Sequence, residues 1–236
     1  MRCWICGGNA DSREHRIKAS DLRRVFGPVS LENPVFHRTP DKRRIPVGSI
    51  KSKRLQFEAK ICNDCNSRRT QPHDIAWEGL SHYLGTNIIS IARNRRFDLS
   101  RVFPGGTKKS AIEVQLYFAK IFGCLIVEHN IPIDLRTFST AIITESAHPH
   151  LYLSFILRPE AANRKEAAIT PIQAVMRNDV PVFASWYYRL GGLIVDVVYS
   201  IDSEFMNIVK NYFHPHISKK LVRLGSFKTN RYSQLS

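Results

Sequence analysis

The alternation of apolar and polar positions divides the first third of the chain into short elements. Residues 53–61 alternate polar and apolar side chains, a pattern typical of a half-buried strand. A helix is predicted from Pro72 to Leu84, where apolar residues recur at helical spacing and the proline falls in the first turn. Ser20-Asp21 is expected to cap a shorter helix. Residues 28–50 contain four prolines, so we expect a loop there.

The second half of the chain has longer apolar runs. A Ser110-x-x-Glu113 capping box precedes a segment to Val127 that is apolar nearly all round, which predicts a buried helix with Cys124 as a packed core thiol. A short helix is expected near residues 204–213. Four further runs read as strands: Phe138–Thr144, Leu151–Leu157, Val182–Tyr188 and Leu193–Ser200. This order favours a mixed α+β domain with an antiparallel sheet.

A change in composition predicts two domains. Residues 97–109 include Pro104-Gly105-Gly106 and are interpreted as a linker. The domain before it, residues 1–96, has the order cysteine pair, strand, cysteine pair, helix, which indicates a small ββα module. The domain after it, residues 110–236, is the α+β domain. Its expected roles are recognition of a target or partner, or formation of a homodimer.

The charge balance points to a polyanionic partner. The chain of 236 residues has 35 Lys and Arg against 20 Asp and Glu, which gives a net charge of +15 and a pI near 9.9. Residues 1–110 carry 22 of these basic residues and 10 of the acidic ones. We therefore expect the protein to bind nucleic acid.

The sequence predicts a cytoplasmic protein with no membrane partner. Residues 1–20 lack the apolar segment of a signal peptide, and no run of 18 apolar residues is present. In a reducing compartment, paired cysteines indicate a metal more often than a disulfide.

Four of the five cysteines form two pairs, Cys3-x-x-Cys6 and Cys62-x-x-Cys65. Thiolates at positions i and i+3 of a tight turn point toward one centre, and two such turns complete a tetrahedron. We therefore predict a structural Zn²⁺ ion. A zinc ion with four thiolate ligands has no open position, so it would not act in catalysis.

Polar residues near these pairs have chemistry that a zinc scaffold does not need. Glu14-His15 lies between the pairs, Asn66 directly follows the second pair, and His73 begins the predicted helix. A carboxylate can hold a hard cation such as Mg²⁺, and a neutral imidazole can take a proton from water. Each residue also has a structural interpretation, as a surface pair, a helix cap or a solvated side chain.

Taken together, these residues follow one order along the chain: Cys3-x-x-Cys6, Glu14-His15, Cys62-x-x-Cys65-Asn66. This order resembles the HNH endonucleases, which are ββα-metal nucleases with a zinc-binding knuckle, and the resemblance covers about residues 1–85. It implies a metal-dependent endonuclease that hydrolyses nucleic acid, DNA in particular, and is active in restriction or defence. His15 would be the general base, and Glu14 and Asn66 would hold a catalytic Mg²⁺ or Mn²⁺ ion.

The chain departs from the family where an asparagine usually orients the base histidine. Either Gln56 or Asn33 could take this role here. The segment Val29–Lys51 is interpreted as an insertion. His73 is expected to be a second-tier ligand of the catalytic ion, with Asp74 as a rival in the same place.

Four arginines are expected to contact nucleic acid: Arg43, Arg44, Arg68 and Arg69. The first two belong to a basic run that begins at Lys42, which could equally be a solvated loop tip.

Three other patterns are open to two interpretations each. His148-Pro149-His150 and His214-Pro215-His216 could bind a metal or simply occupy loops at strand ends, and Trp186-Tyr187-Tyr188 could stack on bases or fill a sheet core. Two alternatives to the nuclease are a catalytically inactive nucleic-acid-binding protein and a zinc-stabilised platform that binds a partner protein.

Overall fold

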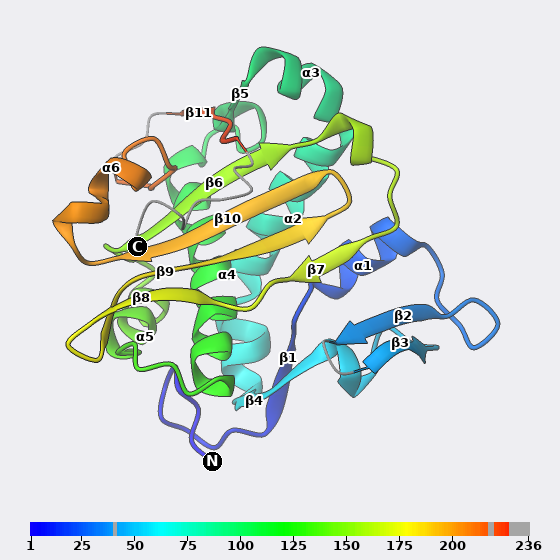
Figure 1. Cartoon of the computed structure of the whole chain (residues 1–236), viewed down its shortest axis with the longest axis horizontal. Helices are drawn as coiled ribbons and strands as arrows, with labels where there is room; N and C mark the ends of the chain where they lie inside the picture. The colour runs from blue at the N-terminus through cyan, green and yellow to red at the C-terminus, as the bar shows by residue number, and fades with distance from the viewer. Residues whose placement is uncertain (40–41, 217–219, 227–236) are drawn as a thin grey trace.

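The computed structural model describes residues 1–39, 42–216 and 220–226 and shows a mixed α+β protein with antiparallel sheets (Figure 1). This confirms the predicted fold class in outline. The elements of the first half are β1 (Ser12–His15), α1 (Ala19–Phe26), β2 (Val35–Thr39), β3 (Lys42–Val47), η1 (Lys53–Leu55), β4 (Gln56–Ile61), the π-helix η2 (Cys65–Arg69), α2 (Gln71–Thr86) and α3 (Ile88–Asn94).

The second half supplies a five-stranded sheet and the longest helix. Its elements are β5 (Arg96–Asp98), η3 (Leu99–Arg101), α4 (Thr107–Glu128), α5 (Arg136–Ile143), β6 (Leu151–Leu157), η4 (Pro159–Ala161), β7 (Ala167–Ile169), β8 (Gln173–Arg177), β9 (Val180–Leu190), β10 (Leu193–Ser200), η5 (Ser203–Phe205), α6 (Met206–Val209) and β11 (Leu221–Arg223). The large sheet has the order β6-β10-β9-β7, and β8 also pairs with β9.

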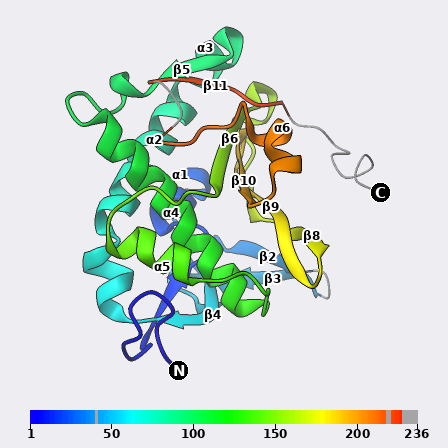
Figure 2. The ribbon, with the colours of Figure 1, turned by 90° about the vertical axis from the view of Figure 1, so that its left-hand side faces the viewer.

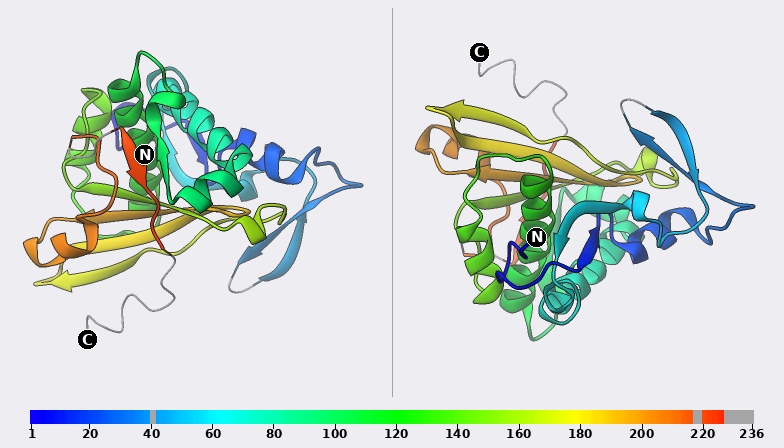
Figure 3. Two further views of the ribbon diagram at one scale, coloured as in Figure 1. Left: turned by 90° about the horizontal axis from the view of Figure 1, so that it is seen from above. Right: turned by 90° about the horizontal axis from the view of Figure 1, so that it is seen from below.

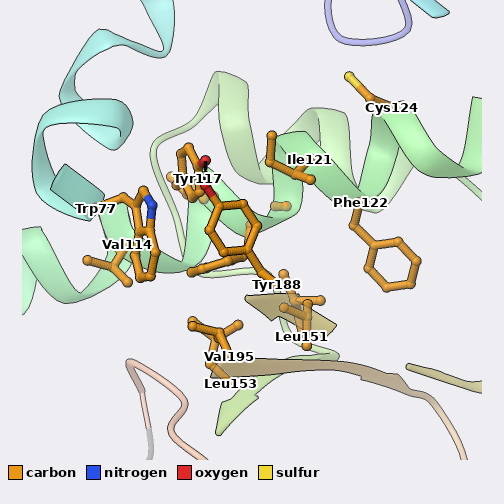
Figure 4. Packing of buried hydrophobic residues seen from close by; sticks show 14 of the residues in the cluster. Trp77, Val114, Tyr117, Ile121, Phe122, Cys124, Leu151, Leu153, Tyr188 and Val195 are labelled. Carbon is orange, nitrogen blue, oxygen red and sulfur yellow. Dashed lines mark hydrogen bonds between the residues drawn. The ribbon is translucent and has the colours of Figure 1, made fainter. Parts of the chain in front are cut away.

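Helix α4 lies at the centre of the fold, between α2 and the large sheet (Figure 2). Every residue from Val114 to Ile126 is buried. Aromatic rings join the three layers: Tyr117 of α4 stacks on Trp77 of α2 with centroids 5.5 Å apart, and both rings meet Tyr188 of β9 edge-on (Figure 4). Such contacts stabilise a core beyond the area that they bury.

The apolar character of α4 reflects this central position. By length and composition alone the helix could cross a membrane, but 78% of its most apolar window is buried inside the fold. The central helix of a soluble protein has the same character, so α4 is weak evidence for a membrane span.

The core does not break at the expected linker. Residues 97–109 contain β5, η3 and the start of α4, and β5 pairs with β11 near the end of the described chain. One cluster of buried side chains runs from Cys3 to Val222. An ion pair between Arg16 and Glu128 also joins the two halves, and Glu128 accepts a hydrogen bond from the main-chain N–H of Glu58 at 2.6 Å.

Three local predictions need correction. The run Phe138–Thr144 falls on helix α5 (Arg136–Ile143) and its C-cap and is not a strand, because the buried Phe138, Ala141 and Ile142 recur at helical spacing. Helix α1 begins at Ala19, and the side chain of Asp21 does not cap it but points into the core. Helix α4 begins three residues before the predicted capping box, at Thr107.

Residues 28–50 are not a simple loop, because strands β2 and β3 pair as a two-stranded ribbon. The ribbon projects away from the rest of the protein (Figure 3). The strands predicted at Leu151–Leu157 and Leu193–Ser200 are confirmed, and Val182–Tyr188 lies inside β9. The helix predicted from Pro72 to Leu84 is confirmed as α2.

Candidate functional site

The four paired cysteines gather into one cluster that can bind a zinc ion. The Sγ atoms of Cys3, Cys6, Cys62 and Cys65 all lie within 4.8 Å of one another. In the first turn the main-chain N–H of Gly7 donates to the carbonyl of Cys3 at 2.8 Å, and Gly7 itself has a φ of 75°. This left-handed conformation favours glycine, which explains why the turn closes at that residue.

Glu14 and His15 lie on strand β1, which pairs with strand β4. The two strands pair antiparallel, with Ser12 opposite Ile61 and His15 opposite Gln56, and an irregularity falls between Arg13 and His15. Because successive side chains on a strand point to opposite faces, Glu14 turns into the protein and is only 8% exposed.

The carboxylate of Glu14 meets a lysine and not an open site. The Lys120 Nζ atom of α4 lies 3.0 Å from Glu14 Oε2 and 2.9 Å from Asp74 Oδ1. It also lies 3.2 Å from Thr70 Oγ1. Burial alone would lower the pKa of Lys120, but the two carboxylates raise it above the ordinary value for a lysine. The ammonium is therefore charged. We call Glu14, Lys120 and Asp74 the buried ion triad.

Burial raises the pKa of the Glu14 carboxyl, and the charge of Lys120 opposes this rise. The two residues therefore depend on each other, because either charge alone would be costly in this position.

His15 is oriented by a main-chain carbonyl. Its Nε2 atom lies 3.1 Å from the carbonyl oxygen of Ile50, in the segment after β3, so Nε2–H donates and Nδ1 is left as an acceptor. Burial lowers the pKa of His15, and the positive charges of Arg23 and Lys120 lower it further. The imidazole is therefore neutral at pH 7.

The two side chains predicted to orient His15 do not contact it by hydrogen bonds. Asn33 Nδ2 donates to the carbonyl of Pro28 at 2.8 Å. Gln56 lies opposite His15 across the strand pair, but no hydrogen bond joins their side chains in the described structure.

Asn66 ties the start of the helical segment to β1. Its Nδ2 atom donates to Ser12 Oγ at 2.7 Å and to the carbonyl of Arg13 at 3.0 Å. Because the amide nitrogen makes both bonds, the position of Asn66 is fixed relative to the first strand.

His73 is enclosed in the first turn of α2. It is 1% exposed, and its Nδ1 atom has no hydrogen-bond partner in the described structure. Burial lowers its pKa to about 4, and the charge of Lys120 acts in the same direction. It is therefore a neutral side chain, and its neighbour Asp74 is the residue that takes part in the ion triad.

A surface hollow of about 580 Å³ lies beside the triad. It is lined by Lys18, Asn66, Ser67, Arg68, Gln71, Asp74, Ile75 and Glu78. Two of the predicted residues, Asn66 and Arg68, therefore border one opening together with the triad residue Asp74. Glu14 and His15 do not line it.

The predicted ligands of a catalytic Mg²⁺ or Mn²⁺ ion do not form a ready site. Counting histidine, cysteine, aspartate and glutamate in the described residues, only the zinc cluster brings three or more ligand atoms within 4.8 Å of one another. The carboxylate of Glu14 is bound to Lys120, and His73 is enclosed. A divalent ion therefore does not fit between these side chains as they stand.

The predicted nucleic-acid-binding arginines lie in two places. Arg68 and Arg69 pair with Asp64 at 2.6 and 3.7 Å, and the Arg68 side chain is 83% exposed. Arg44 lies on the projecting ribbon, with its guanidinium 4.2 Å from the ring centroid of Phe36. The side chain of Arg43 falls outside the described part of the structure.

The two histidine pairs come together, although 63 residues separate them in the sequence. His214 Nε2 donates to the carbonyl of His148 at 3.0 Å. His148 Nε2 lies 3.0 Å from Thr137 Oγ1, and its Nδ1 accepts the N–H of His150 at 3.2 Å. Both ring nitrogens of His148 are therefore used in structural hydrogen bonds and not as metal ligands.

The remaining candidate side chains belong to the core. Trp186 and Tyr188 are 1% and 0% exposed, so the interpretation of a sheet core is confirmed for both rings. Cys124 is buried, and burial raises its pKa to about 12, which confirms a packed thiol.

Lys120 was not identified from the sequence as a residue of the candidate site. It is the only charged side chain between Val114 and Val127, a segment that is otherwise apolar apart from one glutamine. A lone charge in a buried helix needs a buried partner, and this signal was present in the sequence. The identity of the partners required the folded chain.

Comparison of the chain with protein-family models, with curated proteins and with solved structures gives no match in any of the three.

Proposed function

We propose that this protein is a zinc-stabilised endonuclease of the HNH type that hydrolyses phosphodiester bonds in DNA. The observation that carries the proposal is His15, a neutral histidine whose Nε2–H is held by the carbonyl of Ile50. It directly follows the triad residue Glu14 on the strand that leads from the first cysteine pair. A histidine with one ring nitrogen fixed and the other available as an acceptor suits a general base.

In this proposal Nδ1 of His15 takes a proton from water. The water oxygen bonds to phosphorus while the bond from phosphorus to the 3′ oxygen breaks. The 3′ oxygen takes a proton from solvent water, which leaves a 5′-phosphate and a 3′-hydroxyl. The carbonyl of Ile50 stabilises the imidazolium that forms, because it accepts the Nε2–H. Lys18 and Arg68, which border the hollow, would hold the phosphate backbone.

The catalytic Mg²⁺ or Mn²⁺ ion predicted from the sequence stays a prediction and is not part of this mechanism. No step above passes through such an ion, because Glu14 is bound to Lys120.

The test measures nicking of supercoiled plasmid by zinc-loaded protein with Mg²⁺, with Mn²⁺ and with neither. His15→Ala should reduce the rate by about 10²–10⁴. His82→Ala is the matched control, because His82 is an exposed histidine on α2, and it should cut at the wild-type rate. Equal rates for wild type and His15→Ala, or no cutting of DNA or RNA under any of these conditions, would refute the endonuclease.

A second candidate function is a nucleic-acid-binding protein without catalysis. The buried ion triad favours it, because Lys120 takes up the carboxylates that the nuclease motif would present. Salt-sensitive binding of DNA by a protein that never cuts it would support this candidate. Absence of binding at low salt would instead favour a platform for a partner protein.

The predicted homodimer would form through the second half of the chain. Strand β8 pairs only with β9 in the described structure and has an exposed Met176. An edge strand of this kind is suited to pairing with a second copy. Light scattering at several protein concentrations tests this, and a constant mass of one chain would reject it.

A further inference from the structure

The ammonium of Lys120 is surrounded as a bound cation would be. Its Nζ atom lies within 3.2 Å of four oxygen atoms: Glu14 Oε2, Asp74 Oδ1 and Oδ2, and Thr70 Oγ1. These oxygens come from three separate parts of the chain: strand β1, the residue before α2, and the first turn of α2. The lysine itself comes from a fourth part, helix α4.

The arrangement is enclosed by the protein. The Lys120 side chain is 0% exposed, and those of Glu14 and Asp74 are 10% and 18% exposed. Bringing three charged groups out of water is costly unless each one is paired in good geometry. The ammonium of Lys120 therefore has a fixed position in the fold, unlike a surface lysine that lies near a carboxylate by chance.

We propose that Lys120 is the resident cation of this site and excludes a divalent ion from Glu14 and Asp74. Asp74 turns both of its carboxylate oxygens to the ammonium and Glu14 turns one, and a divalent ion at the same place would meet a like charge at short range. The pair would accept Mg²⁺ or Mn²⁺ only after the lysine charge is removed. This inference does not rest on nuclease activity, since it concerns only which cation lies between the two carboxylates.

The experiment titrates Mn²⁺ into zinc-loaded full-length protein and follows free Mn²⁺ by electron paramagnetic resonance. Lys120→Met, which removes the charge but keeps the length of the side chain, should bind one Mn²⁺ at least about tenfold more tightly than wild type. Adding Glu14→Gln to this variant should abolish the gain. Lys108→Met is the matched control, because Lys108 is an exposed lysine on the same helix, and it should resemble wild type.

Two outcomes would overturn the proposal. One is Mn²⁺ binding by the wild-type protein that the single substitution Glu14→Gln abolishes. The other is a folded Lys120→Met, with full zinc content and a wild-type circular dichroism spectrum, that gains no Mn²⁺. If Lys120→Met does not fold, the comparison of wild type with Glu14→Gln decides, and equal Mn²⁺ binding by the two supports the resident lysine.

Discussion

The zinc cluster and the buried ion triad are two charged centres that the chain builds in different ways. The cluster takes its four ligands from two short turns, so each pair is already local in the sequence. The triad takes Glu14, Asp74 and Lys120 from three elements that only the fold brings together. The cluster consists of four cysteine side chains that need an added cation, whereas the triad contains its own cation, Lys120.

This difference shows which contacts a sequence motif can predict. Strand β1 follows the first cysteine pair and contains Glu14 and His15, so the motif places these two residues close to the cysteine cluster. It says nothing about the distant helix that contributes Lys120. A resemblance that covers one part of a chain therefore leaves open what the rest of the chain adds to the same site.

The largest expected effect comes from breaking the zinc cluster. Cys62→Ser should lose the zinc ion and unfold the N-terminal segment, because structural zinc sites contribute about 10–16 kcal/mol in zinc-finger peptides. Zinc content and thermal melting measure this. Cys124→Ser is the control: it should keep its zinc and lose about 1–3 kcal/mol of stability, because the serine hydroxyl is more polar than the thiol and is buried at the same place. A Cys62→Ser protein that keeps zinc and melts normally would contradict the cluster.

The next effect comes from breaking the triad. Lys120→Met should lower the free energy of unfolding by about 3–5 kcal/mol, because it leaves two carboxylates close together and unpaired. Urea unfolding measures this loss. Adding Glu14→Gln should restore part of it, since one of the two unpaired charges is then gone. Strict additivity of the two substitutions would show that the residues are not coupled.

A smaller effect tests how the zinc cluster is attached to the central helix. The indole of Trp4 lies where a Cβ atom at Gly123 of α4 would be, so Gly123→Ala should cost about 1–3 kcal/mol. Gly85→Ala is the control, because no atom lies within 4 Å of its added Cβ, and it should be neutral or slightly stabilising. Thermal melting compares the two, and equal melting temperatures would reject the close contact.

The smallest effect concerns His148, a buried histidine whose ring nitrogens both take part in hydrogen bonds. Burial lowers the pKa of His148 to about 3, well below that of an unfolded histidine. Stability from this residue is therefore full above pH 6.5 and is lost as the pH falls toward 3. The loss should be about 1 kcal/mol between pH 6.5 and 5.5.

Urea unfolding across this pH range measures the slope. His148→Gln should reduce it by about 1 kcal/mol per pH unit, while other buried histidines such as His73 still contribute, and the exposed His82→Gln should leave it unchanged. An unchanged slope in His148→Gln would place the titrating group elsewhere.

Local patterns predicted the elements whose signals lie within a few residues. Helix α2 and strands β6 and β10 appear at their predicted positions because their periodicity is regular. The segment at Phe138 was misread as a strand because its apolar residues are dense, although their spacing is helical. The β2–β3 ribbon was hidden by its prolines, which normally interrupt strands.

Prediction of the candidate site from the sequence is limited in the same way. The position of His15 between the cysteine pairs follows from the sequence, but the group that orients it is the carbonyl of Ile50. Every residue has such a carbonyl, so no side-chain pattern could have marked this one. The sequence by itself determined the four paired cysteines that can bind zinc, the basic charge and the α+β class, because these depend on residue type and short spacing.

Only the tertiary structure decided that Lys120 lies between Glu14 and Asp74, and that one core crosses the expected linker. Contacts between residues that are far apart in the chain depend on how helices and strands pack, and composition does not encode that packing in any local stretch.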